Sequence, residues 1–151
     1  MAGYKGHIAG GVVFILLGLH FLGNYINPPN ITDMVLYIST AVMFALWPDV
    51  DIKSIGQKIF YTIFFGTDLY LIVQEEYKIA AYFGLIIILP ILAKHRGWTH
   101  TIAAMILIPL PILLYPVYNE GTLTLIGLPY YASAITGYFS HLVLDKKFTL
   151  F

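Results

Sequence analysis

The sequence predicts an all-α integral membrane protein, a bundle of several membrane-spanning helices. Two observations carry this prediction. Of the 151 residues, 59% are hydrophobic and only 11% are charged, whereas a soluble domain is about 45–50% apolar and about 25% charged. The apolar residues also fall into six long runs separated by short breaks. Because a bilayer span needs about 20 mainly apolar residues, six spans would occupy most of the chain, and we expect one transmembrane domain over residues 1–151.

The six runs follow one another along the whole chain. The first covers residues 8–26, and we interpret it as a retained span because it is long for a signal-peptide core and no small-residue cleavage pattern follows it. The others, bounded by turn-forming or charged residues, cover residues 34–47, 59–73, 79–93, 101–118 and 123–144. Four prolines inside these runs are expected to kink their helices: Pro90, Pro109, Pro111 and Pro116.

Three of the runs are short for a bilayer. Residues 34–47, 59–73 and 79–93 form helices of about 14–15 residues, which at 1.5 Å per residue is less than the ~30 Å hydrocarbon core. Their polar ends must therefore enter the membrane. An alternative joins residues 59–93 into a re-entrant hairpin and leaves four full spans. Both interpretations give an even number of crossings.

This parity decides which polar segments meet. Six crossings place residues 6–7, 48–58, 94–100 and 141–151 on one face of the membrane, and the four-span alternative gives the same side. Since cytoplasmic loops are enriched in Lys and Arg, we expect this face to be the cytoplasmic one, with both termini there. Seven of the eight basic residues fall on it: Lys5, Lys53, Lys58, Lys94, Arg96, Lys146 and Lys147.

Most of the histidines gather on the same predicted face, together with three acidic residues. In a chain with so few charges, ionisable groups at the membrane edge are costly unless they are paired or bound to metal, which makes them functional candidates. The group consists of His7, His95, His100, His141, Asp49, Asp51 and Asp145.

Two of the motifs contain histidines at short spacing. His141 and Asp145 are four residues apart, so on a helix their Cβ atoms lie about 5–6 Å apart, close enough to hold one ion. The alternative is a hydrogen-bonded pair that closes a helix end. His95 and His100 place two imidazoles at the mouth of a span, with local hydrogen bonding as the alternative.

Two carboxylates form a third motif. Pro48 precedes Asp49 and Asp51, and an extended turn there can direct both carboxylates at one centre. The alternative is a solvated loop in which an Asp caps a helix. His7 opens the first span among glycines, which permit close helix contact.

The donor types favour a divalent metal. With no cysteine, disulfides, thiolate ligands and a Cys nucleophile are excluded. A set of His and Asp favours Zn²⁺, with Mn²⁺, Fe²⁺ or Mg²⁺ as alternatives. Seven candidates exceed the three or four ligands that one catalytic zinc needs. Either two metals lie side by side, or some of these residues support the ligands or act as a general base.

Three further polar residues lie in or beside the apolar runs. Arg96 is the only arginine, and its planar fork suits a phosphate or carboxylate, which predicts an anionic group near the metal. The alternative is an anchor to lipid headgroups. His20 is expected to make an interhelical hydrogen bond, and Asp68 to serve helix packing nearer the opposite face. The balance of eight basic against eight acidic residues gives no reason to expect a nucleic-acid partner.

Four motifs together resemble a known family: Gly6-His7-x3-Gly11, Leu46-Trp47-Pro48-Asp49-x-Asp51, His95-Arg96-Gly97-x-Thr99-His100 and Gly137-x2-Ser140-His141-Leu142-x2-Asp145. The set is similar to bacterial and archaeal inner-membrane proteins described as membrane-bound metal-dependent hydrolases, one of them LexA-binding. The resemblance covers essentially the whole chain. It implies a divalent metal at the cytoplasmic edge of a multi-span helical protein, and it leaves LexA as a partner by resemblance alone.

By motif match, the resemblance assigns seven residues to the metal site: His7, Asp49, Asp51, His95, His100, His141 and Asp145. The sequence departs from the family after the last Asp. Family members commonly continue with a Thr-Pro-x-Gly-like turn and another hydrophobic stretch, whereas this sequence reads Lys146-Lys147-Phe148-Thr149-Leu150-Phe151. Whatever that extension contributes must be missing or supplied otherwise.

The leading hypothesis is a metal-dependent hydrolase whose site opens at the cytoplasmic membrane surface. Activated water would attack an ester or phosphoester of a lipid or amphipathic substrate, Asp49 or Asp51 would accept its proton, and Arg96 would hold the anionic group. A metal or ion transporter is the second hypothesis, weakened because the cluster lies at one edge and the chain shows no internal repeat. The third is a non-catalytic scaffold or regulator with a structural metal, although its short loops offer little interface.

Overall fold

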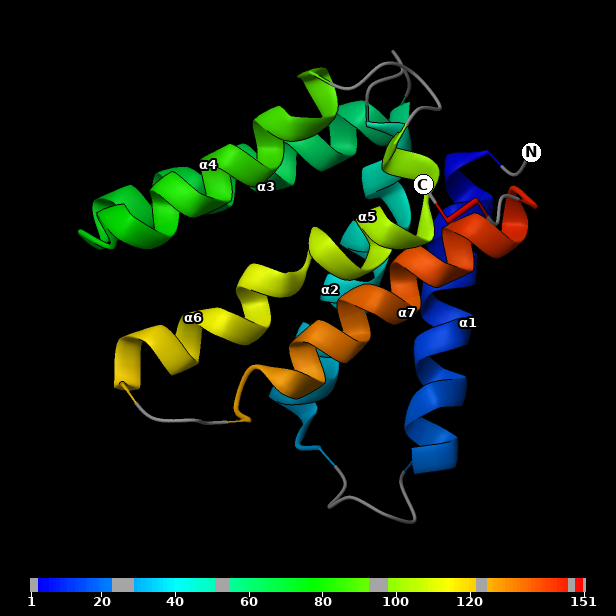
Figure 1. The fold of residues 1–151 in the computed structure, drawn as a ribbon, viewed down its shortest axis with the longest axis horizontal. Helices are drawn as coiled ribbons and strands as arrows, with labels where there is room; N and C mark the ends of the chain where they lie inside the picture. The colour runs from blue at the N-terminus through cyan, green and yellow to red at the C-terminus, as the bar shows by residue number, and fades with distance from the viewer. Residues whose placement is uncertain are drawn as a thin grey trace.

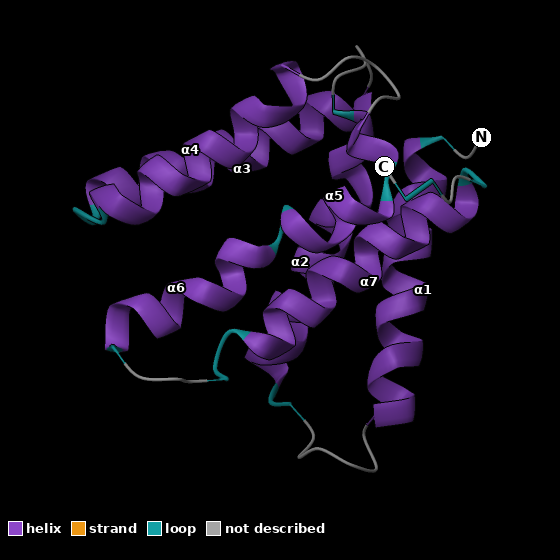
Figure 2. Ribbon diagram, viewed as in Figure 1, coloured by secondary structure: helices purple, strands orange, loops and turns teal. Residues whose placement is uncertain are grey.

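The computed structural model describes residues 3–22, 29–50, 55–92, 98–121, 125–146 and 149–150. This part of the chain is helical, and its one β feature is an isolated bridge between Thr101 and Thr149. Figures 1 and 2 show the arrangement, which confirms the predicted all-α fold. The elements in chain order are α1 (Tyr4–Leu22), α2 (Ile31–Leu46), the 3₁₀ turn η1 (Trp47–Asp49), α3 (Ile55–Val73), α4 (Tyr77–Leu92), the 3₁₀ turn η2 (Trp98–His100), α5 (Ile102–Leu107), α6 (Leu110–Glu120) and α7 (Leu128–Leu144).

Each predicted apolar run corresponds to helix, with three differences. α7 begins at Leu128, five residues after the start of the run at 123–144, and has Pro129 in its first turn. The run at 101–118 is divided into α5 and α6 at Ile108 and Pro109, because a proline has no N–H to donate to the preceding turn. α1 and α3 each begin four residues before the apolar run that predicted them. An apolar run marks only the residues that favour the lipid interior, whereas the backbone hydrogen bonds of a helix can continue into the polar residues before it.

Helices α1, α2 and α7 form the centre of the bundle, and glycine lets them approach closely. A Cβ on Gly137 of α7 would overlap the backbone of Ala41 in α2. A Cβ on Gly11 of α1 would lie 3.0 Å from the Cβ of Ala45 and 3.3 Å from the Ala41 carbonyl oxygen. Small residues at helix contacts are the usual means of close packing in membranes.

The α3–α4 hairpin projects from this centre (Figure 1) and is fastened to it by aromatic rings. Phe60 stacks on Phe64 with ring centroids 4.1 Å apart, and Phe64 stacks on Phe83 of α4 at 4.4 Å. Phe60 and Phe64 also belong to the buried core that includes Trp47, Tyr138 and Leu142. Both the six-span interpretation and the re-entrant alternative require such a hairpin.

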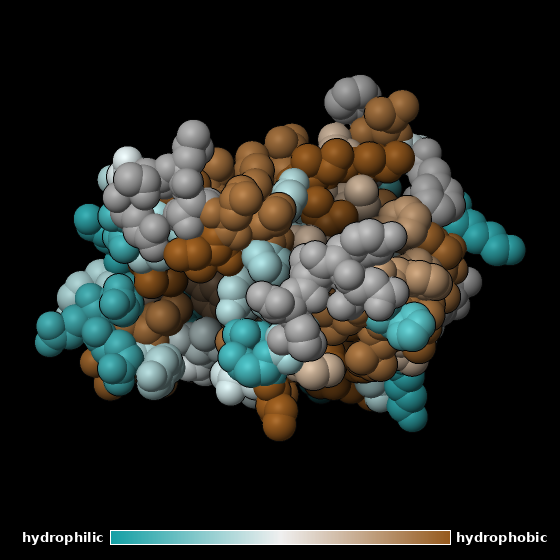
Figure 3. Space-filling model, turned by 90° about the horizontal axis from the view of Figure 1, so that it is seen from below, coloured by the Kyte–Doolittle hydropathy of each residue, from teal (hydrophilic) through white to brown (hydrophobic). Residues whose placement is uncertain are grey.

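The exterior suits a lipid environment. Large apolar side chains are exposed on every long helix, among them Phe21, Val35, Phe65, Leu85 and Leu114, and Figure 3 shows hydrophobic residues over much of one face. Three stretches are long and apolar enough to cross a membrane: Tyr4–Phe21, Ile31–Asp49 and Ile102–Asn119. The chain is therefore a helical membrane protein, and the number of crossings and the orientation of the termini stay predictions.

The polar helix ends meet at one end of the molecule. The start of α1, η1 at the end of α2, η2 and the end of α7 all lie at the end that carries both chain termini in Figure 1. This is the grouping that the parity argument predicts, and it places the candidate residues within reach of one another.

Candidate metal centre

Five of the predicted residues converge at this end of the bundle. His7 comes from α1, Asp49 ends η1, His100 ends η2, and His141 and Asp145 come from the last turn of α7 and its cap. The three imidazoles are at most 1% exposed. Segments far apart in sequence are thus required to build one buried polar cluster.

Asp49 lies at the middle of the cluster. Its Oδ1 atom lies 3.3 Å from His100 Nε2 and 3.8 Å from His141 Nε2, while its Oδ2 atom lies 3.6 Å from His7 Nε2. The turn that carries Asp49 is fixed by buried Trp47 at its start and by Gln57, whose side-chain amide donates to the Val50 carbonyl at 2.8 Å. One carboxylate therefore faces three imidazoles.

His7 and Asp145 are buried without hydrogen bonds. His7 Nε2 lies 3.5 Å from Asp145 Oδ1, and the Asp145 side chain has no exposed area. Within the part of the chain that the structure describes, neither ring nitrogen of His7 and neither carboxylate oxygen of Asp145 has a hydrogen-bond partner. A buried carboxylate without hydrogen bonds costs on the order of several kcal/mol, which favours a further group, such as a cation, between His7 Nε2 and Asp145.

The tautomer of His141 is fixed by its surroundings. Its Nδ1 atom lies 2.8 Å from the backbone carbonyl oxygen of Ala45 in α2. Because a carbonyl oxygen only accepts, Nδ1 carries the proton and Nε2 of the neutral ring presents a lone pair to the cluster. His7 stacks on the same ring at a centroid distance of 4.0 Å. A hydrogen bond from one ring nitrogen to a backbone carbonyl is a usual way in which proteins orient a metal-binding imidazole.

His100 is held from the other side. Its Nδ1 atom lies 3.1 Å from Thr99 Oγ1, and the Thr99 carbonyl accepts a short hydrogen bond from the hydroxyl of buried Tyr138. Its Nε2 atom lies 3.4 Å from His141 Nε2. Sequence reasoning did not select Thr99 or Tyr138 as supporting residues, because nothing in a sequence indicates which buried hydroxyl meets which imidazole.

The end of the chain also holds the His100 segment. The amides of Ile102 and Ala103 donate to the carbonyls of Thr149 and Leu150 at 3.0 and 3.3 Å, and the Thr149 hydroxyl donates to the His100 carbonyl at 3.4 Å. Thr149 and Leu150 thus pair with the entrance to α5.

The donor set fits a divalent cation. One ligand atom from each of His7, Asp49, His141 and Asp145 lies within 4.8 Å of the other three. Ligand atoms about 2.0–2.2 Å from one ion lie about 3.4 Å apart at the tetrahedral angle, close to most of the contacts given above. Two ionised carboxylates and neutral imidazoles also supply the negative charge that a divalent cation balances. These four residues can hold a metal ion, whose identity the geometry does not specify.

One side of the cluster reaches solvent. The side chain of Asp49 is 25% exposed, whereas those of His7, His141 and Asp145 are fully or almost fully buried. A structural metal site fills every coordination position with protein ligands, whereas a catalytic site keeps one open to water or substrate. Asp49 marks the side from which water or a small group can approach.

The remaining predicted residues do not join this cluster in the described structure. Asp51, His95 and Arg96 lie outside the described residues, so their assigned roles stay predictions. His20 is exposed on α1, near the end away from the cluster, and its printed ring contact is with Phe21. Asp68 has a buried Oδ1 without a hydrogen-bond partner among the described residues, and it lines a cavity of about 450 Å³ between α3 and α4.

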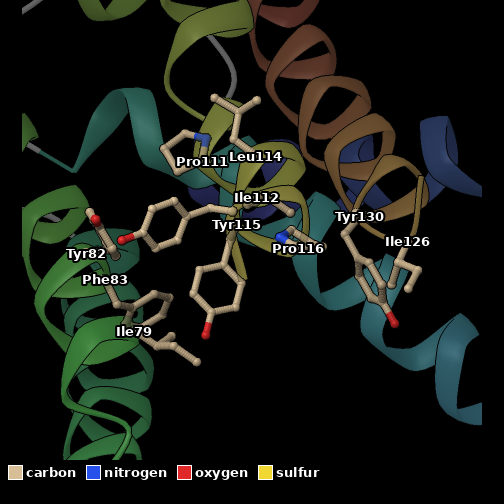
Figure 4. A pocket seen from close by; sticks show the side chains of 12 residues that line it. Ile79, Tyr82, Phe83, Pro111, Ile112, Leu114, Tyr115, Pro116, Ile126 and Tyr130 are labelled. Atoms are coloured by element: carbon tan, nitrogen blue, oxygen red, sulfur yellow. The ribbon is translucent and has the colours of Figure 1, made fainter. Parts of the chain in front are cut away.

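A larger cavity lies apart from the cluster. It has a volume of about 520 Å³ and is lined by residues of α4, α6 and the start of α7, including Phe83, Tyr115 and Tyr130. Figure 4 shows its apolar and aromatic walls. None of the described residues that line it is a histidine, an acid or a base, so we assign the candidate chemistry to the cluster and not to this cavity.

Comparison with known proteins gives a family. No curated protein and no solved structure matches the chain. The profile of the family described as YdjM inner membrane protein matches residues 1–148, a range that contains every residue of the cluster. The chain therefore belongs to the YdjM inner membrane protein family.

Proposed function

We propose that this protein is a membrane-embedded metal-dependent hydrolase that acts on ester or phosphoester bonds of lipid or amphipathic substrates. One observation carries the proposal: buried, hydrogen-bond-free His7 and Asp145 meet Asp49 and His141 in a group that can hold a cation and that opens to solvent on the Asp49 side. The unsatisfied buried atoms support a bound cation, and the opening supports catalysis over a purely structural metal.

Different residues of the chain would bind the cation and transfer the proton. When bound, a divalent cation supplies a Lewis acid that polarises a carbonyl or phosphoryl oxygen and makes water a nucleophile near neutral pH. His7, Asp49, His141 and Asp145 would hold it, with Nε2 of His141 directed by the Ala45 carbonyl. Since Asp49 contacts three imidazoles, it suits a ligand better than a proton acceptor, and the sequence offers Asp51 for proton transfer.

The placement of the cluster supports a substrate at the membrane surface. It lies where several helices end; exposed Lys5 and Lys146 lie at two of these ends, and exposed Lys58 lies in the first turn of α3, which follows η1. Lys78, Glu75 and Glu76 lie at the opposite end of the α3–α4 hairpin. A positive rim beside apolar helices favours an amphipathic substrate with an anionic head. A transporter would instead place its ion site near the midplane.

The test is hydrolysis by the purified protein in lipid nanodiscs. The protein is washed with chelator, loaded in turn with Zn²⁺, Mn²⁺ and Mg²⁺, and incubated with lipid phosphomonoesters, lipid phosphodiesters and acyl esters, with products measured by mass spectrometry. We expect turnover that needs metal and is lost in His141→Ala, while Asp68→Asn keeps it. Absence of turnover with every metal and every ester class would overturn the proposal.

A further inference from the structure

The two oxygens of Asp49 face different partners. On one side, Oδ1 lies 3.3 Å from His100 Nε2 and 3.8 Å from His141 Nε2, and these two nitrogens are 3.4 Å apart. On the other side, Oδ2 lies 3.6 Å from His7 Nε2, which is 3.5 Å from Asp145 Oδ1. Asp49 thus links two sets of three ligand atoms, which also approach each other directly where His141 Nε2 lies 3.9 Å from Asp145 Oδ2.

Each set has the dimensions of a site for its own cation. Three atoms about 3.4 Å apart are spaced as neighbouring ligands of one ion at about 2.0–2.2 Å. His100 falls outside the group whose ligand atoms all lie within 4.8 Å of one another, although it lies at ligand spacing from Asp49 and His141. A single ion among the four grouped residues therefore leaves His100 without a direct role, whereas two ions employ all five side chains.

We infer that the cluster is a binuclear centre in which the Asp49 carboxylate bridges two divalent cations, one held by His100 and His141 and the other by His7 and Asp145. Two metals about 3.5–4 Å apart, held together by shared ligands, form a familiar class of hydrolytic site. The inference rests on the proposed function for its substrate, but the number of bound ions can be measured without any activity.

The charge of such a centre selects a substrate class. Two divalent cations carry four positive charges against the two carboxylates of Asp49 and Asp145, so these five side chains leave a positively charged centre within a largely apolar bundle. An exogenous anion is needed to balance it. A phosphoryl group carries that charge and can span two cations, whereas an uncharged acyl ester cannot balance it. The preferred substrates are therefore phosphate esters.

The first experiment counts metal ions. Detergent-purified protein is saturated with Mn²⁺ or Zn²⁺, freed of excess metal, and analysed by elemental mass spectrometry, with electron paramagnetic resonance of the Mn²⁺ form. We expect two equivalents per chain and a spin-coupled Mn²⁺ pair. One equivalent with an uncoupled Mn²⁺ signal in the wild type would overturn the inference, and this readout needs no variant to fold.

Substitutions then test which side chains bind which of the two cations. His100→Ala and His7→Ala should each retain one equivalent and lose the spin coupling, because each removes a ligand from one set only. Asp49→Asn should also lose the coupling, since an amide has a single oxygen that ligates a cation. Asp68→Asn, which changes a carboxylate outside the cluster, should keep two coupled ions. Two equivalents in His100→Ala would contradict the assignment.

Binding of inorganic phosphate separates this inference from the proposed function. Titration calorimetry of the metal-loaded wild type should show phosphate binding at least ten times tighter than in His100→Ala. Two coupled ions and phosphate binding without turnover would leave the binuclear centre in place and overturn the hydrolase. Turnover of esters by a protein that binds one ion would support the hydrolase and overturn the binuclear centre.

Discussion

The imidazole of His7 and the carboxylate of Asp145 face each other across 3.5 Å, from the first and the last long helix, without a hydrogen bond between them. Both side chains are removed from solvent. Packing alone does not explain this pair, because burying an imidazole and a carboxylate without hydrogen bonds in an apolar core is unfavourable. The consequences of this relationship for stability and metal binding can be measured.

Replacing Asp145 with Asn should change stability in opposite directions with and without metal. In chelator, the variant loses a buried charge, and we expect it to gain about 1–2 kcal/mol. With saturating metal, the wild type should gain about 2.7 kcal/mol at a hundredfold excess over Kd, and the variant should gain little. Thermal unfolding followed by tryptophan fluorescence measures both effects.

Asp68→Asn is the matched control for that prediction. Asp68 also has a buried oxygen without a hydrogen-bond partner in the described residues, but it lies on α3, outside the metal group. This variant should therefore keep the full metal-dependent rise in melting temperature. A full rise in Asp145→Asn as well would show that Asp145 does not bind the metal.

Thr99→Val should weaken metal binding through His100. The Thr99 hydroxyl lies 3.1 Å from His100 Nδ1, and loss of a residue that orients a metal-binding imidazole lowers affinity about 10–100-fold. Competition with a fluorescent chelator measures the affinity, and the melting temperature in excess chelator reports any general loss of stability. Thr136→Val, which removes a hydroxyl bonded to its own helix, should leave the affinity unchanged.

Gly137→Ala should disrupt the bundle. A methyl group there would overlap the Ala41 backbone, whereas nothing lies within 4 Å of the position that a Cβ on Gly84 would take. Overpacking commonly costs about 1–3 kcal/mol, and here it would also move His141 away from the Ala45 carbonyl. We expect Gly137→Ala to lose stability and metal together in size-exclusion and metal analyses. Gly84→Ala should behave as wild type, and equal behaviour of the two variants would contradict the packing described.

Removing residues 149–151 should loosen the His100 segment. The amides of the half-buried Ile102 and Ala103 would lose the carbonyls that accept from them, and a typical hydrogen bond contributes about 0.5–1.5 kcal/mol to stability. Thr149→Val keeps those backbone bonds and loses only the 3.4 Å contact with the His100 carbonyl, so its effect should be small. Melting temperatures of the truncated and substituted proteins, each with and without metal, test this difference.

The sequence predicts the helices well because lipid imposes a strong constraint on composition. Each apolar run contains a helix, and five of the residues that parity predicts on one face lie at one end of the bundle: His7, Asp49, His100, His141 and Asp145. Helix starts were less accurate, since α1 begins at Tyr4, in residues that an apolar run does not include.

The supports of the cluster could not be predicted. The Ala45 carbonyl that orients His141 is a backbone atom 96 residues away, and any residue type there would offer it. The pairing of Thr149 with Thr101 likewise leaves no periodic pattern, because backbone atoms make it. Contacts of this kind depend on how the helices pack, which follows from Gly11 and Gly137 only once their neighbours are known.

The distribution of the cluster over α1, η1, η2 and α7 also sets an order of events during biosynthesis. Chains are made from the N-terminus, so His7 enters the membrane long before His141 and Asp145 exist. No cation can be held between these residues until α7 has docked against α1 and α2. Metal uptake would therefore report that insertion is complete, and a cell starved of the metal would accumulate an inserted protein whose last helix is held by packing and by hydrogen bonds such as that between His141 and the Ala45 carbonyl.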